Sequence, residues 1–269
     1  MNAHLAPGAR ILILSEDGAT PGQVARALVE RGYGESAITV FEHMGGPKER
    51  RIDGAAASWP VGRLADLNTV AVVCVAGADA VVLPSAPGLP DDLFQHDGQL
   101  TKRELRAATI AALAPLPGQT LWDVGAGCGS VAIEWLRAAR GGRAYAVERE
   151  AARGRLIARN AAYMGVPQVN LVEGEAPAAL AGLPAPDTVF IGGGLSTAGL
   201  AEHCWEALKP AGLLVANAVT VEGEAALIEL QRRYKGTLTR IEIQRAESIG
   251  AMHGWRPAMP VTQFSARKS

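Results

Sequence analysis

The stretch from Leu121 to Ser130, LWDVGAGCGS, constrains the fold of this chain more than any other segment. A strand-like apolar run reaches the acidic Asp123, and a glycine at every second position over 125–129 precedes a helix-like run over 131–140. Such glycines let the backbone approach a ligand closely, and the free N–H groups of a helix starting at Ser130 would point at that ligand. The segment therefore predicts a strand, a ligand-binding turn and a helix.

The spacing of these glycines favours S-adenosylmethionine over a dinucleotide as the ligand. The pattern is G-x-G-x-G, and Ser130 stands where a dinucleotide-binding helix carries a packing Gly or Ala. A second strand ends in Glu148, 23 residues after Gly125, where doubly wound folds bind ribose hydroxyls. Two later strands lead into residues 174–177 and into a glycine triplet at 192–194. Signals after four successive strands indicate a nucleoside-binding site.

Strands and helices alternate beyond residue 92, which predicts a doubly wound α/β fold. The expected strands lie at 119–124, 143–148, 168–173, 186–191 and 211–218, and the expected helices at 102–114, 130–140, 150–164, 197–208 and 221–234. Runs at 237–244 and 260–266 have no helix between them, so we expect an antiparallel hairpin at the edge of the sheet. Thr101 and Glu104 are expected to form a capping box for the first helix.

A proline-rich stretch predicts a linker at residues 83–91. Residues 83–90 hold three prolines and one glycine, which exclude a helix and disfavour a paired central strand. Residues 1–82 are expected to form a small α/β lobe, and residues 92–269 a Rossmann-like domain. In the lobe we expect strands at 10–14, 37–42 and 69–76, a helix at 20–31, and a solvated turn rather than a ligand loop at 43–50.

The composition is that of an ordinary globular protein of 269 residues, 48% of them hydrophobic. A net charge of −1 gives no overall attraction to nucleic acid or to anionic membranes. Three cysteines without close spacing, no apolar run long enough for a membrane span and no secretion signal predict a cytoplasmic protein.

Several motifs, taken together, resemble a known family. They lie at 97–104, 125–129, 173–177, 192–194 and 217–220. From about residue 92 onward the chain is similar to the C-terminal half of the precorrin-6Y C(5,15)-methyltransferase (decarboxylating) family of cobalamin biosynthesis. The resemblance implies a class I methyltransferase fold with a mostly parallel seven-stranded sheet. It also implies methylation of carbon 15 of a precorrin with loss of the ring-C acetate carboxylate, and a homo-tetramer.

The N-terminal lobe resembles a different part of the same family. Segments 14–18, 45–50 and 65–68 look like the second lobe of a tetrapyrrole methylase that acts at carbon 5. The first lobe, which carries that methylase's cofactor loop, has no counterpart here, so carbon-5 activity is not expected.

Motif positions and the resemblance together imply a binding site for S-adenosyl-L-methionine and its product S-adenosyl-L-homocysteine. Cys128 stands where a Thr is common, and Glu175 where an Asp is usual; both changes are sterically mild. The expected contacts are Thr101, Gly125, Ala126, Gly127, Cys128, Gly129, Glu148, Glu175, Ala176 and Gly192.

A flat substrate lined with carboxylates requires cationic side chains and apolar surfaces. The candidates are Lys102, Arg103, Arg245 and Trp255. Residues 252–256 are expected to form a loop over the carboxyl ends of the strands, with Arg256 holding the acetate carboxylate and His253 as a proton donor. No metal is expected, because the macrocycle itself supplies the nucleophile.

Two other functions stay open from the sequence. One is a methyltransferase acting on RNA or on another small molecule, although Gly192–Gly194 replace the Asn/Asp-Pro-Pro-Tyr/Phe motif of base-amine methylases and the charge disfavours RNA. The other is a non-catalytic module that binds the cofactor.

Overall fold

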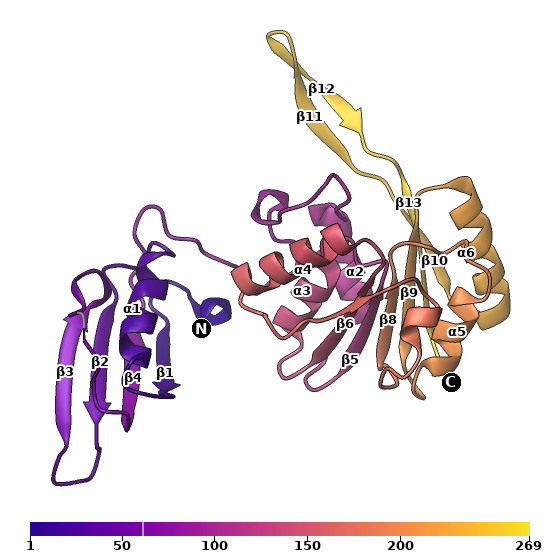
Figure 1. The fold of residues 1–269 in the computed structure, drawn as a ribbon. Coiled ribbons are helices and arrows are strands. Elements are labelled where there is room, and N and C mark those ends of the chain that lie inside the picture. Colours follow the sequence, from indigo (N-terminus) through magenta and orange to yellow (C-terminus); the bar gives the residue numbers. More distant parts are fainter. Residues whose placement is uncertain (61) are drawn as a thin grey trace. The chain divides into compact units, whose positions relative to one another are not determined.

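The structure is a computed structural model that describes residues 1–60 and 62–269 (Figure 1). It divides into two compact units, Met1–Leu83 and Pro84–Ser269. Residues 84–91, expected to form most of the linker, belong to the second unit.

The first unit is a four-stranded antiparallel sheet in the order β1-β4-β2-β3. One helix packs against it, because Leu28 of that helix shares a core with Ile38, Val40 and Val70 of the strands. The unit's elements are η1 (Asn2–His4), β1 (Arg10–Leu14), α1 (Thr20–Val29), β2 (Ala37–Glu42), β3 (Arg50–Ala55), η2 (Ala56–Ser58) and β4 (Asn68–Val73). Strand β3 has a polar sequence and was not predicted.

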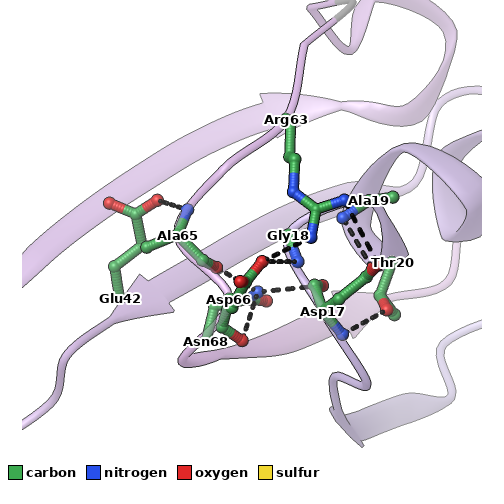
Figure 2. A network of polar contacts seen from close by, with 9 residues as sticks. All are labelled: Asp17, Gly18, Ala19, Thr20, Glu42, Arg63, Ala65, Asp66 and Asn68. Carbon is green, nitrogen blue, oxygen red and sulfur yellow. Dashed lines mark hydrogen bonds and ion pairs between the residues drawn. The ribbon is translucent and has the colours of Figure 1, made fainter.

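Hydrogen bonds hold the loops at one end of this sheet together (Figure 2). The buried Asn68 donates from Nδ2 to the carbonyl oxygens of Ala65, at 2.8 Å, and Asp17, at 3.3 Å. Asp66 accepts from the backbone N–H of Gly18 at 3.0 Å. A Cβ on Gly18 would lie 1.9 Å from the carbonyl oxygen of Leu64, so only glycine fits there. The polar groups of this end are occupied by one another, which indicates a structural network.

The second unit is built on a seven-stranded sheet in the order β10-β13-β9-β8-β5-β6-β7. Neighbours from β9 through β7 are parallel, and β13 is antiparallel to both β9 and β10. The strands are β5 (Thr120–Val124), β6 (Arg143–Glu148), β7 (Asn170–Glu173), β8 (Thr188–Ile191), β9 (Leu213–Ala218), β10 (Thr237–Ile241) and β13 (Val261–Arg267). The helices are η3 (Asp91–Leu93), α2 (Arg103–Leu113), α3 (Ser130–Ala138), α4 (Ala151–Tyr163), η4 (Ala178–Leu180), α5 (Leu200–Ala207) and α6 (Val221–Tyr234).

Burial in this sheet explains why the alternating pattern could be predicted. Strands β5 and β8 are buried at every position, as expected where helices cover both faces of a parallel sheet. From β5 the chain order runs outward through β6 to β7 on one side and through β8 to β9 on the other. Ligands bind at such a switch point, beyond the carboxyl ends of the strands. Within the described residues, no helix is both long and apolar enough to cross a bilayer.

The segment between β10 and β13 differs from the prediction. The expected pairing of these two strands is confirmed, but residues 252–256 do not form a loop. They belong to a second hairpin, made by β11 (Gln244–Ile249) and β12 (Met252–Pro257), which extends away from the sheet (Figure 1). Gly250, with a φ of 60°, turns the chain between the paired Ile249 and Met252. Glycine with positive φ is typical of such two-residue turns.

The predicted capping box is also wrong. Helix α2 begins at Arg103, its N-cap is Lys102, and no side chain caps it. The backbone at Thr101 is instead tied to the helix through the guanidinium group of Arg106, which donates to the Thr101 carbonyl oxygen.

Candidate functional site

A cleft of about 690 Å³ opens in the second unit at the carboxyl ends of β5, β6 and β8. One part of it is formed by the segments 98–102, 123–127, 147–149, 174–176 and 192–194. The other part, contributed by β9, β10 and the chain around β13, is almost entirely apolar. The cleft thus combines a polar half, built on the glycine turn, with an apolar half.

The glycine turn has a backbone that side chains would disrupt. Gly125, Gly127 and Gly129 have φ values of 73°, 59° and 81°. A Cβ on Gly125 would lie 2.8 Å from the backbone nitrogen of Gly193, so the two glycine segments touch. The N–H groups of Gly125 and Ala126 both donate to the carbonyl oxygen of Val147. This turn forms a cradle whose open side faces the cleft.

Glu148 lies at the tip of β6 and is 5% exposed. Its Oε2 accepts from the N–H of Gly127 at 2.8 Å, and its Oε1 accepts from the N–H of Glu150 at 3.0 Å. The carboxylate is therefore fixed relative to the glycine turn before any ligand binds. A fixed buried carboxylate with remaining lone pairs suits the hydroxyl groups of a ribose.

Asp123, to which no role was assigned from the sequence, is the other buried carboxyl group of the polar half. It lines the cleft, is 1% exposed and accepts from the N–H of Ala132 through Oδ2, while its Oδ1 has no partner. Burial raises the pKa of Asp123 to about 7; the Ala132 hydrogen bond opposes this and the Glu148 charge adds to it. An unpartnered buried carboxyl oxygen beside the turn fits the positive charge of a ligand. Its place two residues before the first glycine of the turn was the signal for it.

Residues 95–102, here called the strap, pass beside the glycine turn, where the carbonyl oxygen of Gln99 would lie 3.6 Å from a Cβ on Gly127. The strap is anchored by Arg106 of α2, which is fully buried and donates to Glu134 at 2.6 Å, to Asp91 at 3.0 Å and to the Thr101 carbonyl oxygen. Glu134, also buried, accepts from the N–H groups of Gly88 and Leu89. The chain before α2 is therefore held by an ion pair between two helices.

Asn160 of α4 joins the strap to the glycine turn. Its side chain exchanges two hydrogen bonds of 2.9 Å with the backbone of Gln95 and donates a third, at 3.0 Å, to the carbonyl oxygen of Cys128. Neither Asn160 nor the Arg106–Glu134 pair was predicted, because a polar residue in a helix normally indicates a solvated face.

Most of the predicted cofactor residues lie around the cleft. Those lining it are Thr101, Gly125, Ala126, Gly127, Glu148, Glu175, Ala176 and Gly192. Cys128 and Gly129 are not among the lining residues. The Cys128 side chain is buried, which raises the pKa of its thiol, and a Cβ on Gly129 would contact Ile157 at 3.1 Å. These two positions face the protein interior.

The predicted substrate residues are more dispersed. Lys102 lines the cleft, but Arg103 does not. The remaining four lie on the β11–β12 hairpin and outside the cleft lining: Arg245, His253, Trp255 and Arg256. Arg245 pairs with Glu104, and Arg256 pairs with Glu247 at 3.1 Å. The structure thus does not gather these side chains at the cleft of their own chain.

Comparisons with known proteins agree with this geometry. The family model described as "Precorrin methyltransferase domain" matches residues 92–268. A precorrin-6Y C(5,15)-methyltransferase [decarboxylating] from Sinorhizobium sp is 52% identical over 265 residues, which are 98% of this chain. The chain spans 64% of that relative's length, less than two thirds.

Two solved structures are similar to this chain. The C-terminal domain of precorrin-6Y C5,15-methyltransferase from Rhodobacter capsulatus is 46% identical, with a TM-score of 0.66, covering 69% of this chain and all of that one. A SAM-dependent O-methyltransferase from Thermotoga maritima is 12% identical, with a TM-score of 0.56 over 89% of this chain and 96% of that one, a likeness that shows only the fold. Together with the strand order, these matches establish the class I methyltransferase fold expected from the sequence. By the family model and the relatives, the chain belongs to the family of precorrin methyltransferase domains.

Proposed function

We propose that this protein is an S-adenosylmethionine-dependent C-methyltransferase of cobalamin biosynthesis, acting in the cytoplasm. Its reaction would be methylation of carbon 15 of a precorrin, with decarboxylation of the ring-C acetate. The observation that carries the proposal is the two-part cleft, in which a nucleoside-type polar half adjoins an apolar half in a precorrin methyltransferase domain. The names of the relatives support the choice of substrate over RNA.

The polar half fits the cofactor. S-adenosylmethionine, when bound, supplies an electrophilic methyl group on a sulfonium centre. The glycine turn would pass beneath its methionine part, Glu148 would accept from the ribose hydroxyls, and Asp123 would offer a carboxyl oxygen to its positive charge. No residue has to act as a nucleophile, because the macrocycle provides an electron-rich carbon.

The apolar half fits a flat macrocycle. Its residues exclude water and hold the ring, so that the reacting carbon meets the methyl group in line, which is the main requirement of this reaction. Lys102 at the strap end of the cleft would bind one of the substrate carboxylates. Among the residues that the structure describes, its ammonium group forms no ion pair within the second unit.

We also propose that the protein assembles as a homo-tetramer through the β11–β12 hairpin. A two-stranded hairpin is marginally stable alone, and this one exposes Ile249, Met252 and Trp255 at 66%, 73% and 73%. Replacing Trp255 by Ser should shift the mass measured by light scattering toward the monomer, while a monomeric wild type at micromolar concentration would contradict the assembly.

Arg256 and His253 keep their proposed roles in decarboxylation, as carboxylate clamp and proton donor. Because they lie outside the lining of their own cleft, in the tetramer they would serve the cleft of a neighbouring copy. Mixed oligomers test this. At a limiting cofactor concentration, Glu148→Gln and Arg256→Ala subunits should each have low activity alone and should regain activity when combined. Failure to recover activity would place the clamp elsewhere.

The function is tested by calorimetry with S-adenosylhomocysteine and by mass spectrometry of the product formed from a purified precorrin. We expect one binding site per chain and a product that has gained CH₂ and lost CO₂. Binding without turnover would instead identify a non-catalytic module, and no binding would overturn the proposal.

Replacing Glu148 provides the sharpest test of the cofactor-binding site. Glu148→Ala should weaken binding of S-adenosylhomocysteine at least about tenfold, since a hydrogen bond to a charged group contributes about 1.5–3 kcal/mol. The matched variant Glu150→Ala removes a neighbouring carboxylate that does not line the cleft and should bind normally. Unchanged affinity in a folded Glu148→Ala protein would exclude Glu148 from the site.

A further inference from the structure

Asn217 has no assigned function, although its motif contributes to the family resemblance. It lies near the end of β9 and lines the cleft. Among the described lining residues beyond position 210, Asn217 is the single polar side chain. The others are Val219, Ile241, Ile243, Ala258, Met259 and Val261. An isolated carboxamide in an apolar wall can define the orientation of a ligand.

Two side chains from two other elements hold this carboxamide. Asn217 donates from Nδ2 to the Thr109 hydroxyl oxygen on α2 at 2.9 Å, and its Oδ1 accepts from Nε2 of Gln263 on β13 at 3.0 Å. Gln263 Nε2 also approaches the Thr109 hydroxyl oxygen at 3.3 Å. Thr109 is 0% exposed and Gln263 is 7% exposed.

The hydroxyl group of Thr109 determines which way the amide faces. Its proton is committed to the carbonyl oxygen of Leu105, at 2.9 Å, so its oxygen can only accept from the two amides. The nitrogen of Asn217 must therefore face Thr109, and its oxygen must face Gln263. One N–H and one lone pair of the Asn217 carboxamide remain for a ligand.

We propose that Asn217 is a substrate-contacting residue that hydrogen-bonds a polar edge group of the macrocycle and so fixes its rotation against the methyl donor. This role rests on the proposed function. Thr109 and Gln263 are positioning residues that act through Asn217. A carboxamide locked by buried partners has a fixed direction, which is the property that alignment of a flat substrate requires. Because the carboxamide is uncharged, it does not compete with the polar half of the cleft for the cationic cofactor.

The test uses the full chain, a purified precorrin and two readouts. Asn217→Ala should lower kcat/KM at least about tenfold, as expected for loss of a hydrogen bond in a water-excluded site, and leave the affinity for S-adenosylhomocysteine within about twofold. Thr109→Val should lower kcat/KM by a smaller factor. Asn170→Ala is the matched control, since Asn170 donates to the carbonyl oxygens of Ala144 and Gln168 and does not line the cleft.

A double mutant separates positioning from a general effect on folding. If Thr109 acts only through Asn217, adding Thr109→Val to Asn217→Ala should change kcat/KM by less than about twofold. Asn217→Asp keeps the size of the side chain but removes the N–H, and should show the same defect if Asn217→Ala fails to fold.

Three outcomes would overturn the role of Asn217. They are an unchanged kcat/KM in both folded variants, an equal loss of cofactor affinity and turnover, or fully additive effects in the double mutant. A wild type that binds S-adenosylhomocysteine but does not convert the precorrin would overturn the proposed function itself, and this role with it.

Discussion

At the scale of single residues, Asp123 links cofactor binding to pH. Its pKa is raised from 3.8 to about 7, so the folded protein holds this proton more tightly than the unfolded chain. Ionisation of Asp123 favours the binding of a positively charged cofactor. Affinity for S-adenosylmethionine should therefore rise as pH increases from about 6 to about 7.5, a window below the α-amino pKa of about 8. Calorimetry at several pH values checks this, and Asp123→Asn should lose the dependence.

The same carboxyl group should destabilise the free protein at neutral pH. Because its folded pKa is raised, ionisation favours the unfolded state progressively from about pH 4 to about pH 7, and the effect is constant above that range. The full difference corresponds to about 4 kcal/mol. Asp123→Asn should raise the free energy of unfolding at pH 8 relative to the wild type, by much more than at pH 4. A variant less stable than the wild type at pH 8 would contradict this.

At the scale of elements, the strap depends on one buried ion pair. Arg106→Met leaves the buried Glu134 without its partner, which should cost about 3–5 kcal/mol of unfolding free energy in urea. Adding Glu134→Leu removes the unpaired charge and should restore part of this stability, because the N–H groups of Gly88 and Leu89 then lose their acceptor. The double variant should still bind S-adenosylhomocysteine more weakly, because the Thr101 carbonyl oxygen has lost its donor. Wild-type affinity in the double variant would show that the strap needs no anchor.

Most elements of the second unit could be predicted from the sequence because their signals are local. The strand predicted at 143–148 is β6 without a change of boundary, and the expected pairing of the last two strands is confirmed. Strands β11 and β12 were not predicted, although Gly250, which turns the chain between them, is a residue type typical of hairpin turns. The Arg106–Glu134 pair spans 28 positions and Thr109–Asn217 spans 108, so neither contact could be derived from local pattern.

At the scale of the whole molecule, the two units have separate cores, and the cleft is lined by the second unit alone. Deleting residues 1–82 should therefore preserve the binding of S-adenosylhomocysteine and the turnover of a precorrin. Calorimetry and the product assay on the truncated protein check this. A soluble, folded truncation without activity would show that the first unit contributes to the reaction.

The hairpin couples two properties that are usually measured apart. Its base contributes Ile243 and Ala258 to the cleft wall, joined by a hydrogen bond of 2.9 Å, while its far end is exposed and is the proposed contact between copies. Restraining the far end would stiffen that wall. Specific activity should consequently depend on enzyme concentration and should fall when the enzyme is diluted below the dissociation constant of the assembly. A plot of reaction rate against enzyme concentration should therefore curve upward.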